Sequence, residues 1–332
     1  MNNMNWNEII GHKNKISNIR DMIKSQQFPN AVIFFGAEGI GKRKIAETAA
    51  AALLCENDDA PCGHCKSCQL FLANTHPDYH YIEPDRSKAN PMIKIEQIRN
   101  MQRDVSLMPV VSKRRIVIID DADCMNKISQ NCLLKTIEEP QGLSKFILIT
   151  SNRSGLLLTI RSRCMMINFE PLTKADIALG LSLRNIEEAE KIAAISNGSL
   201  GQAIKLTENN GFQIREDTLK FLESLQNMNI ENMFAVSQTL SSQPKELFIE
   251  WTIHLQKFLR DLLVINENIS DEYFYNGDIK ARLQKLKGKF IDSKIYAILH
   301  ETAEIQRRLR SNANLQLLID SFFIRLKQNM QN

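Results

Sequence analysis

The sequence predicts an α/β fold, with a parallel sheet in the first half of the chain and helices in the second. Two observations support this prediction. Through about residue 170, short apolar runs rich in β-branched residues alternate with helical patterns, and after Pro171 the strand signals nearly vanish. Apolar strands separated by helices are typical of a parallel sheet covered on both faces. A chain of 332 residues is also long enough for two or three domains.

The expected strands are short apolar runs that end at glycine or polar residues. They cover residues 31–35, 79–83, 115–119, 146–150 and 165–169. Helical spacing of apolar residues separates several of them, at 44–54, 93–105 and 126–137.

The second half is expected to be helical throughout. Thr173 can cap a helix that begins near Lys174, with Asp176 at its third position. Helical segments are expected at 174–183, 186–196 and 199–206, and amphipathic stripes continue beyond about 210. The predicted domains are therefore residues 1–170, with a zinc module at 55–68, then a helical lid at 171–208 and an α-helical domain at 209–332.

Composition excludes some classes of protein. Hydrophobic residues make up 43% and charged residues 24% of the chain, as in ordinary globular proteins. No apolar run is long enough to span a membrane, and the first residues lack the profile of a secretory signal, so a cytoplasmic location is expected. The net charge of +4 permits nucleic-acid binding without establishing it.

Four of the seven cysteines are close in sequence. Cys55, Cys62, Cys65 and Cys68 have the spacing C-x6-C-x2-C-x2-C, which supplies four thiolates for a closed tetrahedral zinc site. We therefore expect one structural Zn²⁺, although the spacing alone also permits an iron–sulfur cluster. The other three cysteines lie in apolar segments and are expected to be buried thiols: Cys124, Cys132 and Cys164.

A glycine-rich segment follows the first predicted strand and opens a helix. The candidate phosphate-binding residues are Gly36, Gly39, Gly41 and Lys42, since the glycines bring backbone N–H groups to phosphate and the lysine adds charge. The next residue, Arg43, stands where a hydroxyl usually holds magnesium. Binding of ATP and Mg²⁺ is thus left open, and a loop kept only for tight packing is the alternative.

Acidic residues end the strand 115–119. Asp120 stands where phosphate-loop ATPases orient magnesium, and Asp121 replaces the glutamate that commonly polarises the attacking water. An aspartate is one methylene shorter, which weakens the case for hydrolysis. Capping of the next helix is the alternative role. Ser151, after the strand 146–150, completes the candidate nucleotide-binding set.

Arg163 lies in the segment Ser162-Arg163-Cys164, between two predicted strands. Such an arginine is often a surface charge, and Arg161 nearby supports that interpretation. A guanidinium held at a domain edge is also what an arginine finger requires.

Together these segments resemble the AAA+ (RecA-like) clamp-loader family of bacterial DNA polymerase III. The similar segments are IGH at 10–12, GAEGIGKR at 36–43, the four cysteines, 116–123, LLKTIEEP at 133–140 and TIRSRC at 159–164. The detailed similarity covers about 1–170, and the rest agrees in length and helical character.

The resemblance implies a subunit that assists ATP hydrolysis in a neighbour. ATPase subunits of the family have Ser or Thr after the loop lysine, Glu after the first acidic residue, and an arginine in a Gly-Ser-x-Arg lid pattern. Here these positions hold Arg43, Asp121 and Gly201, whereas Arg163 keeps the family's finger motif. The chain is thus expected to have neither ATPase nor polymerase activity of its own.

The resemblance also implies partners. They are the gamma/tau ATPase subunits and the delta subunit in a hetero-pentamer joined by C-terminal helical collars, the sliding clamp, and primer–template DNA facing the helix 126–137. Two alternatives stay open at this point. One is an active gamma-like clamp-loader ATPase, and the other is a separate zinc-dependent DNA-binding protein, which the modest charge disfavours.

Overall fold

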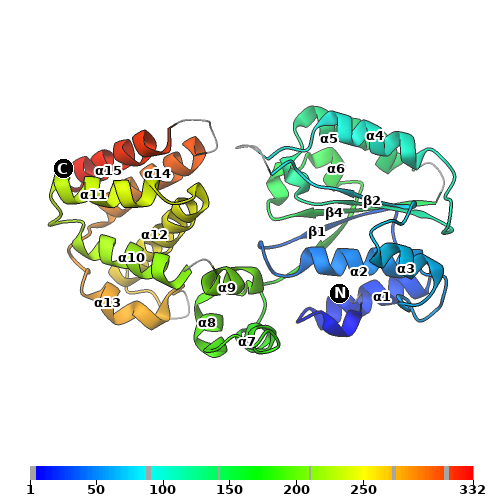
Figure 1. Ribbon diagram of the computed structural model, residues 1–332, viewed down its shortest axis with the longest axis horizontal. Helices are drawn as coiled ribbons and strands as arrows, with labels where there is room; N and C mark the ends of the chain where they lie inside the picture. Colours follow the sequence, from blue (N-terminus) through cyan, green and yellow to red (C-terminus); the bar gives the residue numbers. More distant parts are fainter. Residues whose placement is uncertain are drawn as a thin grey trace. The chain divides into compact units, whose positions relative to one another are not determined.

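The computed structural model describes residues 5–86, 91–140, 143–208, 211–270, 274–309 and 314–331. The chain forms two compact units, which are residues 1–183 with 198–201, and residues 184–197 with 202–332 (Figure 1). The predicted division into three domains remains a prediction, and its last boundary, Asn209, lies outside the described residues. Among the described helices, none has the length and apolar character needed to cross a bilayer.

The first unit contains a five-stranded, all-parallel sheet with the strand order β2-β3-β4-β1-β5. Its strands are β1 Ala31–Phe35, β2 Tyr79–Ile82, β3 Arg115–Ile119, β4 Ser144–Thr150 and β5 Met165–Asn168. The predicted parallel sheet is confirmed, and each predicted strand is present within about two residues at its ends.

Helices cover both faces of this sheet (Figure 1). One face carries α1 Lys13–Lys24, α2 Lys42–Leu54 and α3 Lys66–Leu72, and the other carries α4 Ile95–Val105, α5 Lys127–Glu138 and α6 Leu158–Arg161. The alternation of strand side chains divides the core, because Ile116 and Ile118 of β3 pack on the first face and Val117 and Ile119 pack on the second. Three 3₁₀ turns complete the sheet region: η1 Trp6–Glu8, η2 Ala122–Cys124 and η3 Arg153–Gly155.

Helix α7, Lys174–Ser182, begins with the predicted cap. The Thr173 side chain accepts from the Asp176 N–H, and the Asp176 side chain accepts from the Thr173 N–H. This reciprocal capping box satisfies two N–H groups that the first turn leaves without helical partners.

The second unit is helical throughout its described residues. It contains α8 Ala189–Ile195, most of α9 Leu200–Thr207, α10 Gly211–Ser224, α11 Ile230–Ser241, α12 Lys245–Asn266, η5 Gly277–Ile279, α13 Lys280–Gln284, α14 Asp292–Arg308 and α15 Leu315–Gln331. The amphipathic stripes predicted as core are buried around Trp251, which contacts the rings of Phe221, Phe248, Phe322 and Phe323. In this unit, the sequence pattern therefore reports intramolecular packing.

Candidate functional site

The glycine-rich segment forms a tight loop between β1 and α2. Gly36, Gly39 and Gly41 have φ angles of 150°, 74° and 99°, which side-chain-bearing residues rarely adopt. A Cβ on Gly36 would lie 2.2 Å from the Phe169 carbonyl oxygen, so the loop also needs glycine for space. The predicted strand–loop–helix context of a phosphate-binding loop is present.

Lys42 is turned into this loop. Its ammonium group donates to the carbonyl oxygens of Gly36 at 2.8 Å and Ala37 at 2.6 Å, and the residue is only 6% exposed. Burial lowers the pKa of Lys42, because the charged form loses hydration. The charge that a phosphate would meet is thus already hydrogen-bonded to the loop.

Arg43 lies against three carboxylates from three elements. Its Nε is 2.9 Å from Glu47, and its Nη1 is 3.6 Å from Glu83 and 3.8 Å from Asp120. The guanidinium also sits over the Tyr81 ring, 4.7 Å from the ring centroid. The side chain in the position of the usual magnesium ligand is therefore a cation held by acids.

The acidic pair at the end of β3 is bonded within the chain. Tyr81 donates its hydroxyl to Asp120 at 2.7 Å, and Arg86 forms an ion pair with Asp121 at 2.5 Å. Burial and the adjacent Asp120 raise the pKa of Asp121 above its usual value. Asp121 also has a left-handed backbone, with φ of 45°. Both carboxylates thus have partners other than a metal ion.

The neighbouring end of β4 differs from the sequence expectation in one detail. Ser151 is exposed, whereas Thr150 is fully buried and donates to Asp123 at 2.5 Å. The hydroxyl that connects β4 to the acidic segment belongs to Thr150, a residue outside the predicted set.

A short segment, residues 198–201, closes over the glycine loop within the first unit. Ser199 donates to the Glu38 carbonyl and the Gly201 N–H donates to the Gly39 carbonyl, both at 2.8 Å. A Cβ on Gly201 would lie 2.8 Å from the Gly39 Cα. We call these two hydrogen bonds the loop latch. A larger residue at 201, such as the arginine of ATPase subunits, would collide with the loop.

Arg163 lies outside this group of residues. It pairs with Glu138, and its Nη1 donates to the Thr159 carbonyl at 3.0 Å. The side chains of Arg163 and Glu138 are 41% and 42% exposed, whereas Ile160 and Cys164 on either side are buried. Buried anchors therefore hold a surface guanidinium on a short, fixed segment.

Gln130 of α5 ties this segment to the fold. It is 2% exposed, donates to the carbonyls of Met125 and Gly155, and accepts from the Leu157 N–H at 2.7 Å. These bonds fix the backbone that leads into α6 and Arg163.

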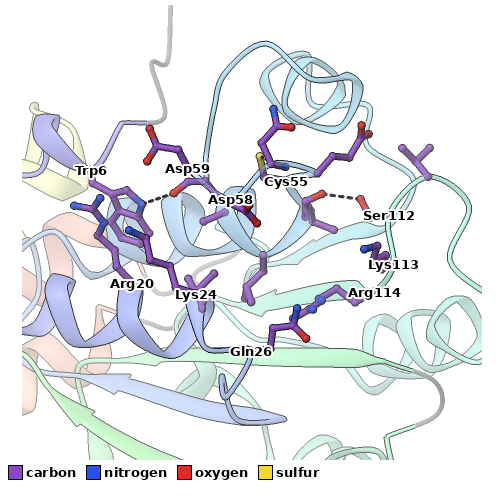
Figure 2. A pocket seen from close by; sticks show the side chains of 18 residues that line it. Trp6, Arg20, Lys24, Gln26, Cys55, Asp58, Asp59, Ser112, Lys113 and Arg114 are labelled. Atoms are coloured by element: carbon purple, nitrogen blue, oxygen red, sulfur yellow. Dashed lines mark hydrogen bonds between the residues drawn. The ribbon is translucent and has the colours of Figure 1, made fainter.

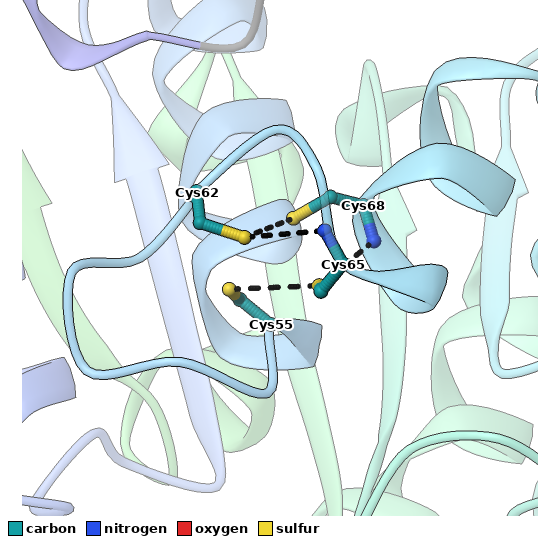
Figure 3. A group of neighbouring side chains, drawn as sticks. All are labelled: Cys55, Cys62, Cys65 and Cys68. Carbon is teal, nitrogen blue, oxygen red and sulfur yellow. Dashed lines mark hydrogen bonds between the residues drawn. The ribbon is translucent and has the colours of Figure 1, made fainter.

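The four cysteine sulfurs converge at the end of α2 (Figure 3). All lie within 4.8 Å of one another, with Cys55–Cys65 at 3.9 Å and Cys62–Cys68 at 4.0 Å. Tetrahedral zinc with Zn–S bonds of about 2.3 Å requires sulfurs about 3.8 Å apart. The predicted ligand set is thus assembled and could hold a metal ion.

Nearby N–H groups favour the thiolate of Cys62, whereas burial raises the pKa of Cys55 and Cys68. Burial opposes ionisation of Cys62, but donors from His64, Cys65 and Asn57 lower its pKa to about 6. The Cys68 N–H donates to Cys65 in the same manner, at 3.4 Å. A ring of N–H donors around sulfur is suited to ligands that bind metal as anions. Of the other three cysteines, Cys164 is buried as predicted, whereas Cys124 and Cys132 are half-buried.

A cavity of about 620 Å³ lies between α1, the end of α2 and the residues that precede β3 (Figure 2). Arg20 and Lys24 of α1 line one side and Lys113 and Arg114 line another, while acidic residues 56, 58 and 59 follow the end of α2. Because its walls carry both signs of charge, charge alone selects no class of ligand for this cavity.

The predicted residues therefore lie at three separate places in the structure. The loop residues, Arg43 and the acidic pair meet at the carboxyl ends of β1 and β3, the cysteines meet at the end of α2, and Arg163 stands on its own segment. Sequence reasoning missed Tyr81, Arg86 and Thr150. Tyr81 lies in strand β2 and Arg86 follows it, so both become visible only once β2 is paired with β3.

Sequence comparison with known proteins identifies the family of this chain. A protein of Pseudomonas aeruginosa named DNA polymerase III subunit delta′ is 32% identical over 313 residues, which cover 90% of this chain and 92% of that protein. The chain belongs to the DNA polymerase III subunit delta′ family. A delta′ subunit of Bacillus subtilis is 28% identical over 92% of this chain and 93% of its own length.

The family descriptions agree with this delta′ assignment. Residues 11–173 match "DNA polymerase III, delta subunit", and residues 209–328 match its C-terminal part. A tau/gamma subunit of Haemophilus influenzae is 29% identical but covers only 60% of this chain and 30% of that protein. The clamp-loader resemblance is thereby confirmed, and the delta′ subunits of Pseudomonas aeruginosa and Bacillus subtilis match over a greater length than this tau/gamma subunit.

Proposed function

We propose that this chain is the delta′ subunit of a clamp loader and acts by donating Arg163 to ATP held by a neighbouring ATPase subunit. The observation that carries the proposal is the contrast between two sites. Arg163 is exposed and held on a fixed segment, while the chain's own acidic pair is bonded to Tyr81, Arg43 and Arg86.

The donated arginine would act by stabilising negative charge on the phosphate being transferred. Negative charge is spread over the γ-phosphoryl oxygens in the transition state of phosphoryl transfer, and a guanidinium brought from a neighbour stabilises it. Glu138 would hold Arg163 in position before assembly and would exchange it for phosphate in the complex. Lysine lacks the planar fork that meets two oxygens at once, so it is a poor substitute.

The proposed partners are the gamma/tau and delta subunits in a hetero-pentamer, the sliding clamp, and primer–template DNA. The names of the delta′ and tau/gamma relatives support this assembly. Helix α5 would face the DNA, where its exposed Lys127 and Lys135 can meet phosphates. Such contacts carry no base-sequence information. A cytoplasmic location remains part of the proposal.

The four cysteines are proposed to hold structural zinc. The metal would cross-link Cys55, at the end of α2, to the three cysteines that lead into α3. Four thiolates leave no open position, so no role in water activation is proposed.

Reconstitution tests the proposal. The isolated chain should show no appreciable ATP turnover, and it should assemble with gamma/tau and delta subunits into a complex that loads clamps. Magnesium-dependent turnover by the isolated chain near about 1 s⁻¹, abolished by Lys42→Ala, would instead establish the active-ATPase alternative. A chain that does not copurify with clamp-loader subunits from native extract would remove the assembly claim.

A further inference from the structure

Arg43 occupies a position with a defined chemical role in phosphate-binding loops. The residue after the loop lysine ordinarily supplies a hydroxyl to Mg²⁺, which also needs a carboxylate at the end of another strand of the sheet. Here the Arg43 side chain extends from that position to the carboxylate of that strand, Asp120. The guanidinium therefore bridges the two protein positions between which the metal is usually held.

The surroundings of the guanidinium are those of a cation site. Glu47 comes from its own helix, Glu83 follows β2 and Asp120 follows β3, so three acids from three elements face one positive charge. The Tyr81 ring lies beneath the guanidinium, and its hydroxyl donates to Asp120. A planar cation over an aromatic face is stabilised by the ring's negative face.

We propose that Arg43 is a built-in replacement for the divalent cation, so that any nucleotide polyphosphate in this loop is held without Mg²⁺. Small divalent cations need oxygen ligands free to coordinate them. In this chain the carboxylate of Asp120 instead accepts the Tyr81 hydroxyl and faces a fixed positive charge. Arg43 thus determines the metal dependence of the site. This inference concerns only the chain's own loop, so its failure is distinguishable from that of a donated Arg163.

The test measures the affinity of the full-length chain for a fluorescent ATP analogue in excess MgCl₂ and in EDTA. The unmodified chain should bind with the same affinity in both, within about twofold, and no detectable binding in either would overturn the proposal. R43T supplies the missing hydroxyl and removes the cation beside Asp120. Its affinity for the ATP analogue should therefore be at least about tenfold higher in MgCl₂ than in EDTA. R43T/D120N should lose that gain.

Two further measurements test whether R43T binds a divalent cation and whether it is folded. Binding of Mn²⁺ alone, followed by electron paramagnetic resonance, should be stronger for R43T than for the unmodified chain, and circular dichroism checks that R43T is folded. R99T, which removes an exposed arginine of α4, should behave as the unmodified chain. Tighter binding with Mg²⁺ in the unmodified chain, or an R43T protein that gains neither Mg²⁺ dependence nor Mn²⁺ binding, overturns the proposal.

Discussion

The two ends of helix α2 differ in how the charged groups around them are neutralised. At its first residues, the loop's lysine donates to loop carbonyls and the half-exposed Arg43 faces three acids, so groups of the chain itself pair with the charges there. At its last residues, four cysteine sulfurs converge within 4.8 Å of one another, a set that could hold a metal ion. At one end the cation is a side chain of the protein, whereas at the other the proposed zinc would come from solution.

This difference indicates which ligand the fold depends on. The glycine loop is held by the loop latch and by the Lys42 hydrogen bonds, all of which are made within the chain. The proposed zinc would hold the cysteine cluster together, because its four ligands bind as thiolates, which repel one another without a cation. Removal of metal should therefore disturb the first unit strongly, and removal of nucleotide should not.

The largest expected effect is that of Cys65→Ser. Loss of one of four ligands should lower the free energy of unfolding of the metal-loaded protein by about 3 kcal/mol or more and reduce bound zinc below half an equivalent. Urea unfolding and metal analysis measure both quantities. Cys132→Ser, at a half-buried cysteine outside the cluster, is the matched control and should keep its zinc. Native protein that contains less than half an equivalent of zinc per chain would contradict the zinc assignment.

A smaller effect is expected at the loop latch. In Gly201→Ala the new methyl group would meet the Gly39 backbone, so the free energy of unfolding should fall by about 1–3 kcal/mol. Gly277→Ala is the control, since a Cβ there has no neighbour within 4 Å among the described residues. Equal stability of the two variants, measured by urea unfolding, would show that the latch is not closed in solution.

The smallest expected effect is on the pH dependence of stability, through a histidine near the cysteine end of α2. His76 is buried, its Nδ1 accepts from the Asp78 N–H, and burial lowers its pKa below 6.5. Because the folded state favours neutral His76, its contribution is complete above pH 6.5 and is lost as the pH falls below that value. His76→Gln should reduce the difference between urea midpoints at pH 7.5 and 5.5. His300→Gln, at an exposed histidine, should leave that difference unchanged.

Local patterns in the sequence were sufficient for the sheet and the cysteine cluster. Buried parallel strands are continuous apolar runs, and metal ligands three residues apart are brought together by one turn of chain. Helix α1 was missed, since only Ile16 and Ile19 are buried along its length and its cap, His12, makes no side-chain capping bond.

Contacts between distant segments could not be predicted. Two of the acids around Arg43, Glu83 and Asp120, follow different strands, so their meeting depends on strand order. Arg86 likewise reaches Asp121 across β2 and β3. The choice between Ser151 and Thr150 depends on where β4 ends relative to η2. Such details follow from the tertiary fold, which a single sequence does not display.

The most direct test of the central claim replaces Arg163 in the reconstituted clamp loader. Arg163→Ala should fold and assemble, because the side chain is exposed and its anchors are intact. DNA-stimulated ATP hydrolysis and clamp loading should both fall, by less than the factor of about 10³–10⁵ that a single finger is worth, since other subunits keep their own. Arg163→Lys should not restore them fully, and Arg161→Ala should matter less. Clamp loading by the Arg163→Ala complex at the unmodified rate would contradict the account.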